Sequence, residues 1–281
     1  MSSVPPPSRP IPGPTPTGGA KVEAQGTEDG GRSGDGAGSP TAGPATNTLV
    51  LMRHGTSAAN LVGRTAGWQD VALSPQGEQD AHAAARAIGA AGISVDVVYA
   101  SALTRAARTA ELVAADLGLP HNVVRRRWRL NERHAGAFEG MTRDEMLDHA
   151  GREVVRAWKR QPTARPPGLG VADRRHPAHD PRYADVPHGL LPSGESSSDV
   201  LHRLLPVWEG EILAALASGH SVLVVSHEHV LRVVTAHLAG TGCNLPEDAP
   251  FPGRIPWAFH LDPVGGGAVS SVRLDPLPDT R

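Results

Sequence analysis

An arginine and a histidine directly follow an apolar run, and their types and spacing could support chemistry. The run is 48–52, and the two residues are Arg53 and His54. If the run is a buried strand of an open α/β sheet, both side chains lie in the crevice outside the strand ends, where such sheets bind ligands. Neutral imidazole is a nucleophile, and guanidinium can bind two oxygens of a phosphoryl group at once. We therefore predict a phosphoryl site with His54 as nucleophile. The alternative is that both residues only cap a surface.

Three further polar groups come at or just after the ends of other apolar or extended runs: Arg105, Glu132 and His227. Phosphoryl transfer depends on positioning the group and neutralising the charge on its oxygens, which Arg105 and His227 could do beside Arg53. A carboxyl group at Glu132 could give a proton to a leaving oxygen or take one from an attacking hydroxyl. Glu132 could instead form an ion pair with its neighbour Arg133.

Strands and helices that could position these groups alternate along the chain. Ser74 and Pro75 are typical of a helix start, and alanine-rich sequence continues the helix through 81–91. We also predict strands over 95–100 and 221–226, helices over 105–117, 195–217 and 230–238, and late strands over 255–261 and 268–274. This order predicts a three-layer αβα sandwich with a mostly parallel central sheet. The late strands, joined by a glycine turn at 265–267, would form an antiparallel edge.

The alternation stops between about residues 141 and 193. A predicted helix over 143–159 is followed by a long segment rich in proline and histidine. Long connections without secondary structure are usually functional. We interpret 141–193 as a lid insertion, and we expect its histidines, His176 among them, to be solvated.

The first 46 residues differ in composition from the rest. They are rich in Pro, Gly, Ser and Thr, have few aliphatic residues and show no periodicity. We predict that 1–46 is a disordered arm and that 47–281 is one large α/β catalytic domain.

Composition also narrows the classes of partner. The 281 residues carry 27 Lys and Arg against 29 Asp and Glu, a net charge of −2, which argues against nucleic acid. No run is apolar for long enough to span a bilayer and the arm lacks a signal-peptide core, so we expect no membrane partner and a cytoplasmic protein. The single cysteine, Cys243, excludes an intramolecular disulfide and a cysteine-built metal cage. His227 and His229 lack the spacing of a helical zinc motif, so we expect no metal.

Six segments resemble those of the histidine phosphatase superfamily, and within it those of the cofactor-dependent phosphoglycerate mutases. They are LMRHGTSAAN, GWQDVALSPQGEQDA, VVYASALTRAARTAEL, WRLNERHAGAFEGM, HDPRYADVPHGLLPSGES and VLVVSHEHVLR. The similarity spans about 47–262. RHG alone is a modest signal, whereas LNERH, DPRY and the basic pair Lys159-Arg160 are more specific to the mutase branch.

The resemblance implies roles for the polar groups named above. His54 would be phosphorylated, and Glu132 would be the acid or base. The phosphoryl group would be surrounded by Arg53, Arg105 and His227. The substrate's carboxylate and second phosphate would be held by Ser57, Asn60, Arg133, Arg143, Lys159 and Arg160. A mutase of this kind needs 2,3-bisphosphoglycerate as phosphorylating primer, with no permanently bound cofactor and no metal.

The chain also departs from the mutase pattern. Glu228 and His229 stand where mutases usually have Gly and Asn after the second catalytic histidine, and we count both among the substrate-binding candidates. A carboxylate beside a phosphate site is repulsive, so Glu228 must point away, be neutralised or change the substrate. Ala135 replaces a tyrosine and leaves a hole. Thr56 replaces a glutamate, which brings the first loop closer to the phosphatase branch.

Three functions fit these residues. The first is a mutase-like isomerase that moves a phosphoryl group between the 2 and 3 positions of phosphoglycerate. The second is a phosphatase in which water, activated by Glu132, hydrolyses a small phosphorylated metabolite. The third is a binding protein for phosphorylated metabolites in which Glu228 has weakened turnover. We favour the mutase. Its partner would be a small phosphorylated substrate. A homo-oligomer is possible, and the sequence leaves the oligomeric state open.

Overall fold

A six-stranded sheet forms the centre of the computed structural model, which describes residues 48–243, 251–261 and 268–275. The strand order is β3-β2-β4-β1-β5-β6. The strands are β1 (Thr48–Arg53), β2 (Val97–Ser101), β3 (Val124–Arg127), β4 (Val222–Ser226), β5 (Trp257–Leu261) and β6 (Ala268–Arg273). The predicted arm over 1–46 and the predicted glycine turn at 265–267 lie outside the described residues.

The sheet is mostly parallel, as predicted. Strand β4 pairs in parallel with both β1 and β2, and β2 pairs in parallel with β3. Strand β5 runs antiparallel to β1, and β6 runs antiparallel to β5. The expected antiparallel edge therefore consists of two strands, with the reversed strand β5 inside the edge strand β6.

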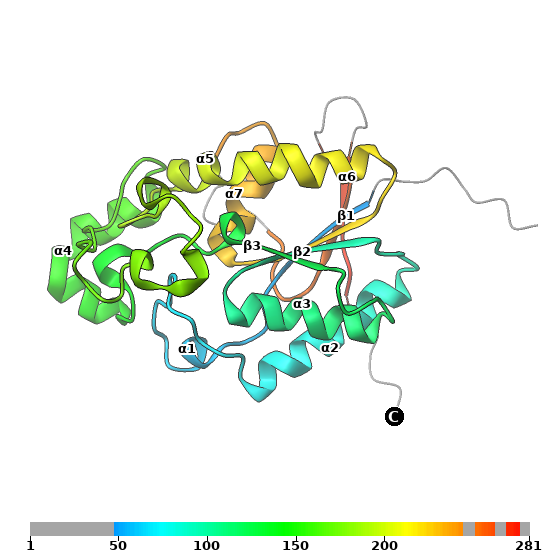
Figure 1. Ribbon diagram of the computed structural model, residues 1–281, viewed down its shortest axis with the longest axis horizontal. Coiled ribbons are helices and arrows are strands. Elements are labelled where there is room, and N and C mark those ends of the chain that lie inside the picture. Colours follow the sequence, from blue (N-terminus) through cyan, green and yellow to red (C-terminus); the bar gives the residue numbers. More distant parts are fainter. Residues whose placement is uncertain (1–47, 244–250, 262–267, 276–281) are drawn as a thin grey trace, which may run out of the picture. The chain divides into compact units, whose positions relative to one another are not determined.

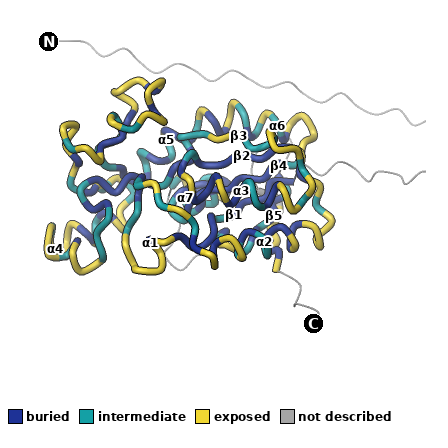
Figure 2. The backbone as a smooth tube through the Cα atoms, turned by 60° about the horizontal axis from the view of Figure 1, so that its bottom comes forward, coloured by how far each residue is buried: buried dark blue, intermediate teal, exposed yellow. Residues whose placement is uncertain are grey.

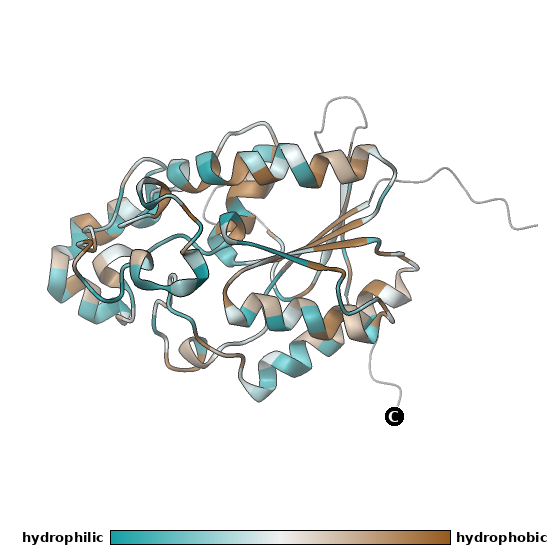
Figure 3. Cartoon of the chain, in the orientation of Figure 1, coloured by the Kyte–Doolittle hydropathy of each residue, from teal (hydrophilic) through white to brown (hydrophobic). Residues whose placement is uncertain are grey.

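Helices cover both faces of the sheet (Figure 1). Alternate residues of β1 point to opposite faces: Leu49 and Leu51 belong to one buried apolar cluster, and Val50 and Met52 belong to another. The first cluster includes residues of α5 (Ser197–Val207) and α7 (Glu228–Leu238), and the second includes residues of α2 (Pro75–Ala90) and α3 (Thr104–Asp116). The apolar colour of the central strands in Figure 3 and their burial in Figure 2 follow from this double cover. The αβα sandwich is confirmed.

Local sequence explains where the elements begin. The Ser74 side chain accepts a hydrogen bond from Gly77 N–H and caps α2, with Pro75 as the first helical residue. The short helix α1 (Ala58–Leu61) is capped by Ser57, whose side chain bonds reciprocally with that of Asn60. Within the described residues, no helix has both the length and the apolar character that crossing a bilayer requires.

One predicted helix has the expected extent but is not regularly α-helical throughout. The segment predicted as a single helix over 195–217 comprises α5, a π-helical turn over Trp208–Leu213 and α6 (Ala214–Ala217). Pro206 lies in the last turn of α5. Proline has no N–H and its ring clashes with the preceding turn, so regular α-helical bonding cannot continue unchanged past it.

The segment over 141–193 is less irregular than predicted. It contains α4 (Arg143–Arg160), broken at Gly151 where φ is +79°, and three short 3-10 turns, Pro177–His179, Pro181–Tyr183 and His188–Leu190. The Tyr183 ring lies 5.1 Å from that of Trp68, which ties the segment to the loop after α1. The expectation that His176 is solvated is wrong. His176 is buried because its two ring nitrogens bond with Ser193 Oγ and the Ala178 N–H.

Candidate active site

The ends of two neighbouring strands bring His54 and His227 together. In the parallel pairing of β1 with β4, Arg53 lies opposite Ser226, so the next residue of each strand is a histidine. The His54 N–H donates to the Ser226 carbonyl at 2.9 Å. The centroids of the two imidazole rings are 5.0 Å apart. This is the crevice outside the strand ends where the sequence placed the site.

His54 has the protonation state of a nucleophile. Its Nδ1 lies 2.6 Å from the Gly55 carbonyl, which can only accept a hydrogen bond, so the ring proton is on Nδ1 and the lone pair is on Nε2. Burial lowers the pKa of His54 well below its usual value, and the positive charges of Arg105 and Arg53 lower it further. The ring is therefore neutral at pH 7.

His227 is buried without a partner. It has no exposed surface, and neither ring nitrogen has a hydrogen-bond partner. Burial also lowers its pKa well below the usual value. A buried polar group without a partner costs free energy, and a ligand oxygen that accepted from the ring would remove that cost.

Arg105 supplies a fixed positive charge. Its guanidinium is buried and donates to the carbonyls of Gln69 at 2.9 Å and Gly67 at 2.8 Å. Burial lowers its pKa to about 10, so the group stays cationic at neutral pH. A guanidinium has five N–H groups, so donors remain for a ligand.

Glu132 faces the same space and has the character of an acid or base. Its Oε1 accepts the Arg133 N–H at 2.9 Å. Burial raises the pKa of Glu132, while that N–H and the charges of Arg105 and Arg53 oppose the rise. A carboxyl group with a raised pKa can give and take protons closer to neutral pH.

Glu228 is neutralised, which was one of its three expected outcomes. It lies 2.8 Å from Arg53 Nη1, and its side chain is 45% exposed. It is the first residue of α7. His229 lies beside it, with Nε2 2.9 Å from Ser197 Oγ, and burial lowers the pKa of His229 well below its usual value.

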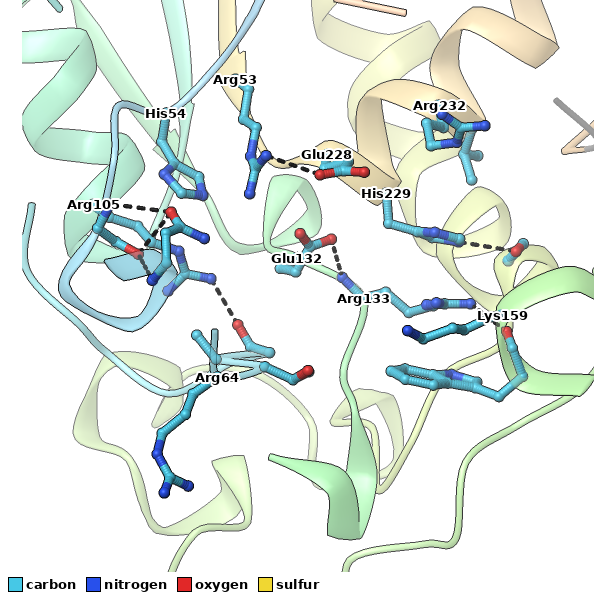
Figure 4. Close-up of a pocket in the computed structure, with 18 of the residues that line it drawn as sticks. Arg53, His54, Arg64, Arg105, Glu132, Arg133, Lys159, Glu228, His229 and Arg232 are labelled. Carbon is cyan, nitrogen blue, oxygen red and sulfur yellow. Dashed lines mark hydrogen bonds and ion pairs between the residues drawn. The ribbon is translucent and has the colours of Figure 1, made fainter. Parts of the chain in front are cut away.

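One cavity of about 800 Å³ joins most of these groups (Figure 4). Every predicted site residue except Arg143 and His227 lines it. These are Arg53, His54, Ser57, Asn60, Arg105, Glu132, Arg133, Lys159, Arg160, Glu228 and His229. His227 is buried behind this lining, beside His54. Arg143, the first residue of α4, is exposed and does not line the cavity.

The far end of the cavity is also cationic. The Arg133 guanidinium lies 4.2 Å from the centre of the Trp158 ring and donates to the Trp158 carbonyl at 2.8 Å. Lys159, Arg160 and Arg232 line the cavity with it. Figure 4 shows Glu132 between this group and the His54 group. The cavity can hold two anionic groups of one small molecule.

The sequence analysis missed several lining residues: Arg64, Trp158, Ser197 and Arg232. The predicted helix over 230–238 begins too late to reveal Arg232, because α7 begins at Glu228, and Arg232, four residues later, therefore shares the face of Glu228. Arg64 carried no usable signal, because it lies in an irregular loop after α1.

Comparisons with known proteins agree with this geometry. A sequence model of the histidine phosphatase superfamily (branch 1) matches residues 49–179 and 170–252. The chain is 44% identical over 214 residues to a 2,3-bisphosphoglycerate-dependent phosphoglycerate mutase of Nitratidesulfovibrio vulgaris (strain DP4), covering 76% of this chain and 86% of that one. It is 41% identical over 226 residues to the protein of the same name from Thermobifida fusca (strain YX), covering 78% and 92%.

A solved structure called Mycobacterial hydrolase 1 has the same fold. It matches with a TM-score of 0.60 at 26% identity, covering 80% of this chain and 95% of that one. The matched names include mutases and a hydrolase. The chain belongs to the histidine phosphatase superfamily and is an enzyme of the mutase or phosphatase type.

Proposed function

We propose that this protein is a 2,3-bisphosphoglycerate-dependent phosphoglycerate mutase. The observation that carries the proposal is the cavity with cations at both ends. Arg53 and Arg105 lie beside His54, and Arg133, Lys159 and Arg232 lie on the other side of Glu132 (Figure 4). A phosphatase needs to bind one phosphoryl group, whereas a bisphosphorylated carboxylate carries three anionic groups. The similarity to enzymes named as mutases supports the same substrate.

The proposed reaction uses each group in turn. His54 Nε2 attacks the phosphorus of the primer, the phosphorus–oxygen bond to the glycerate breaks, and Glu132 protonates the leaving oxygen. Arg53 and Arg105 neutralise the charge on the phosphoryl oxygens, and neutral His227 donates a hydrogen bond to one of them. The phosphohistidine then transfers its phosphoryl group to the free hydroxyl of a monophosphoglycerate, with Glu132 accepting the hydroxyl proton, which gives the bisphosphate and free His54. Transfer of the bisphosphate's other phosphoryl group to His54, with Glu132 protonating the leaving oxygen, releases the isomeric monophosphate and restores the phosphohistidine.

The test follows two products from one incubation. Purified protein is mixed with 3-phosphoglycerate and a trace of 2,3-bisphosphoglycerate, and 2-phosphoglycerate and free phosphate are both measured. We expect 2-phosphoglycerate without matching phosphate, and no formation when the primer is omitted. Free phosphate without isomer would overturn the mutase and favour the phosphatase. Neither product would favour the binding protein.

Two observations favour the phosphatase as the second candidate. Thr56 and Ala135 replace polar groups that mutases usually have, and a structural relative is named as a hydrolase. Ala135 is fully buried in an apolar cluster with Phe138 and Trp158, so the missing tyrosine leaves no polar group at that position. In a phosphatase, water would attack the phosphohistidine and transfer a proton to Glu132.

A further inference from the structure

We infer that Glu139 is a positioning residue for Arg105. The inference rests on the proposed phosphoryl site, in which Arg105 binds the transferred group. Glu139 follows the 3-10 turn Gly136–Phe138 and is only 3% exposed. It does not line the cavity beside His54. Its Oε1 accepts the backbone N–H of Trp68 at 2.7 Å, so a carboxylate outside the site holds the loop that borders it.

Gly67 connects Glu139 to Arg105. The Gly67 backbone has φ +53°, and a Cβ atom there would lie 2.3 Å from Glu139 Oε1, so the carboxylate packs directly against the glycine. The Gly67 and Gln69 carbonyls accept the two hydrogen bonds that hold the Arg105 guanidinium. Glu139 therefore holds the segment 67–69 in place, and the carbonyls of that segment hold the Arg105 guanidinium.

Two backbone bonds strengthen this connection. Gly140 N–H donates to the Thr65 carbonyl at 2.7 Å, and Thr65 N–H donates to the Met141 carbonyl at 2.9 Å. The residues that hold the loop thus lie where the insertion over 141–193 begins. The position of Arg105 therefore depends on the residues where that insertion begins.

The surroundings of Glu139 suit a carboxylate that accepts from several donors. His134 Nδ1 accepts the Gly136 N–H at 3.0 Å, so its proton is on Nε2, which has no hydrogen-bond partner and lies 3.6 Å from Glu139 Oε1. An amide in place of the carboxylate would supply only one acceptor oxygen. A protonated carboxyl group would turn one acceptor into a donor.

The pKa of Glu139 also lies near neutral pH. Burial raises its pKa to about 7, opposed by the N–H groups of Trp68 and Ala135 and by the charges of Arg105 and Arg175. Burial lowers the pKa of His134 to about 3, so that ring stays neutral. Below about pH 7, protonation of Glu139 weakens its hold on the segment 67–69. Anion affinity at Arg105 should then fall.

The test measures sulfate binding by calorimetry, because sulfate is a tetrahedral dianion whose charge is constant across this pH range and whose binding needs no turnover. At about pH 8, we expect Glu139→Gln to weaken sulfate binding about tenfold, and at about pH 6 the difference from the wild type should shrink. Glu111→Gln is the matched control, since Glu111 pairs with Arg126 outside the cavity. It should bind sulfate like the wild type.

Three further variants separate positioning from loss of stability. Gly67→Ala forces a methyl group against the same carboxylate and should weaken sulfate binding in the same direction. In an Arg105→Lys background, Glu139→Gln should have little additional effect, because its action passes through Arg105. Ile88→Ala, in the α2 core, lowers stability without touching this connection and should leave sulfate affinity unchanged.

The outcomes are distinct. Unchanged sulfate affinity in folded Glu139→Gln or Gly67→Ala, or full additivity with Arg105→Lys, would overturn the inference and leave the proposed function standing. A wild-type protein that binds no sulfate at all would overturn the phosphoryl site, and this inference with it.

Discussion

The imidazole rings of His54 and His227 face each other at 5.0 Å, tilted by 59°, although their strands are far apart in the sequence. The parallel register of β1 and β4 is the cause, since it aligns the two strand ends. One ring has a hydrogen-bond partner on Nδ1 and a lone pair on Nε2, and the other has no partner at either nitrogen. One ring is thus prepared to attack phosphorus, and the other to donate to a phosphoryl oxygen.

The first prediction concerns these two rings. His54→Ala should abolish the acid-labile phosphoenzyme, because no other group supplies the nucleophile. His227→Ala should keep the label on His54 but slow its formation by about 10² to 10³, the effect of losing one donor to the transferring group. The amount of phosphoenzyme and its rate of formation are measured with labelled primer and a rapid alkaline quench, which preserves phosphohistidine. Undiminished labelling in His54→Ala would refute the assigned nucleophile.

The second prediction concerns pH. The pKa of His54 is well below its usual value because of burial and two neighbouring arginines, so the neutral ring predominates above that lowered pKa. Lowering the pH to about 6 should therefore not protonate His54, and the rate of phosphoenzyme formation should show no His54 inflection near pH 6.5. Single-turnover rates measured against pH check this. An inflection near 6.5 that remains in both His227→Ala and Glu139→Gln would contradict it.

The sequence could predict that Arg53, His54 and His227 lie close together, because the carboxyl ends of parallel strands meet at one edge of a sheet. Arg53 and His54 follow one apolar run and His227 follows another, and both runs are too apolar to be anything but buried strands. The order of the strands then decides which ends meet. That order was not predicted from the sequence: in the structure β4 lies next to β1, which brings their ends together.

The sequence could not predict contacts that depend on packing between distant segments. The resemblance to the mutases assigned Arg143 to the substrate, but in the structure Arg143 is exposed and does not line the cavity. The Arg53–Glu228 ion pair depends on how α7 begins beside β1, and the burial of His176 depends on Ser193 across the insertion. In the last two cases the outcome depends on a contact with a residue far away in the sequence.

The third prediction concerns Glu228. Its carboxylate holds Arg53 at 2.8 Å, so an incoming phosphoryl group must compete for that guanidinium. Glu228→Gln should tighten binding of inorganic phosphate several-fold, because it removes both the competitor and the repulsion. Glu209→Gln removes the same charge at an exposed position outside the cavity and serves as control. Equal phosphate affinity in the wild type and Glu228→Gln would show that the Arg53–Glu228 ion pair opens without a cost in free energy.

The fourth prediction separates two basic residues that the sequence treated alike. Lys159 lines the cavity, whereas Arg143 is exposed outside it. Lys159→Ala should raise the KM for phosphoglycerate about tenfold, the loss expected for one charge-assisted hydrogen bond. Arg143→Ala should change the KM less than about twofold. A KM for Arg143→Ala that matched that of Lys159→Ala would mean that α4 moves Arg143 to the substrate.

The fifth prediction concerns the support of Glu132. Arg203 donates to the carbonyls of Asn131 at 2.7 Å and Glu132 at 2.9 Å, and it forms a buried ion pair with Glu195 at 2.6 Å. Arg203→Met should lower the free energy of unfolding by about 3 kcal/mol, because it leaves the Glu195 carboxylate buried without its partner. The double variant Arg203→Met with Glu195→Gln should recover part of that loss, since no unpaired charge is left.

Activity distinguishes this support from general stability. Arg203 touches the backbone that presents Glu132 but lies outside the cavity, so Arg203→Met should lower kcat while phosphate affinity stays close to wild type. The double variant should regain stability without regaining kcat, because the hydrogen bonds to the Asn131 and Glu132 carbonyls stay broken. Urea unfolding and steady-state kinetics on the same preparations measure both quantities. If kcat recovered together with stability in the double variant, Arg203 would contribute to the fold and not to the placement of Glu132.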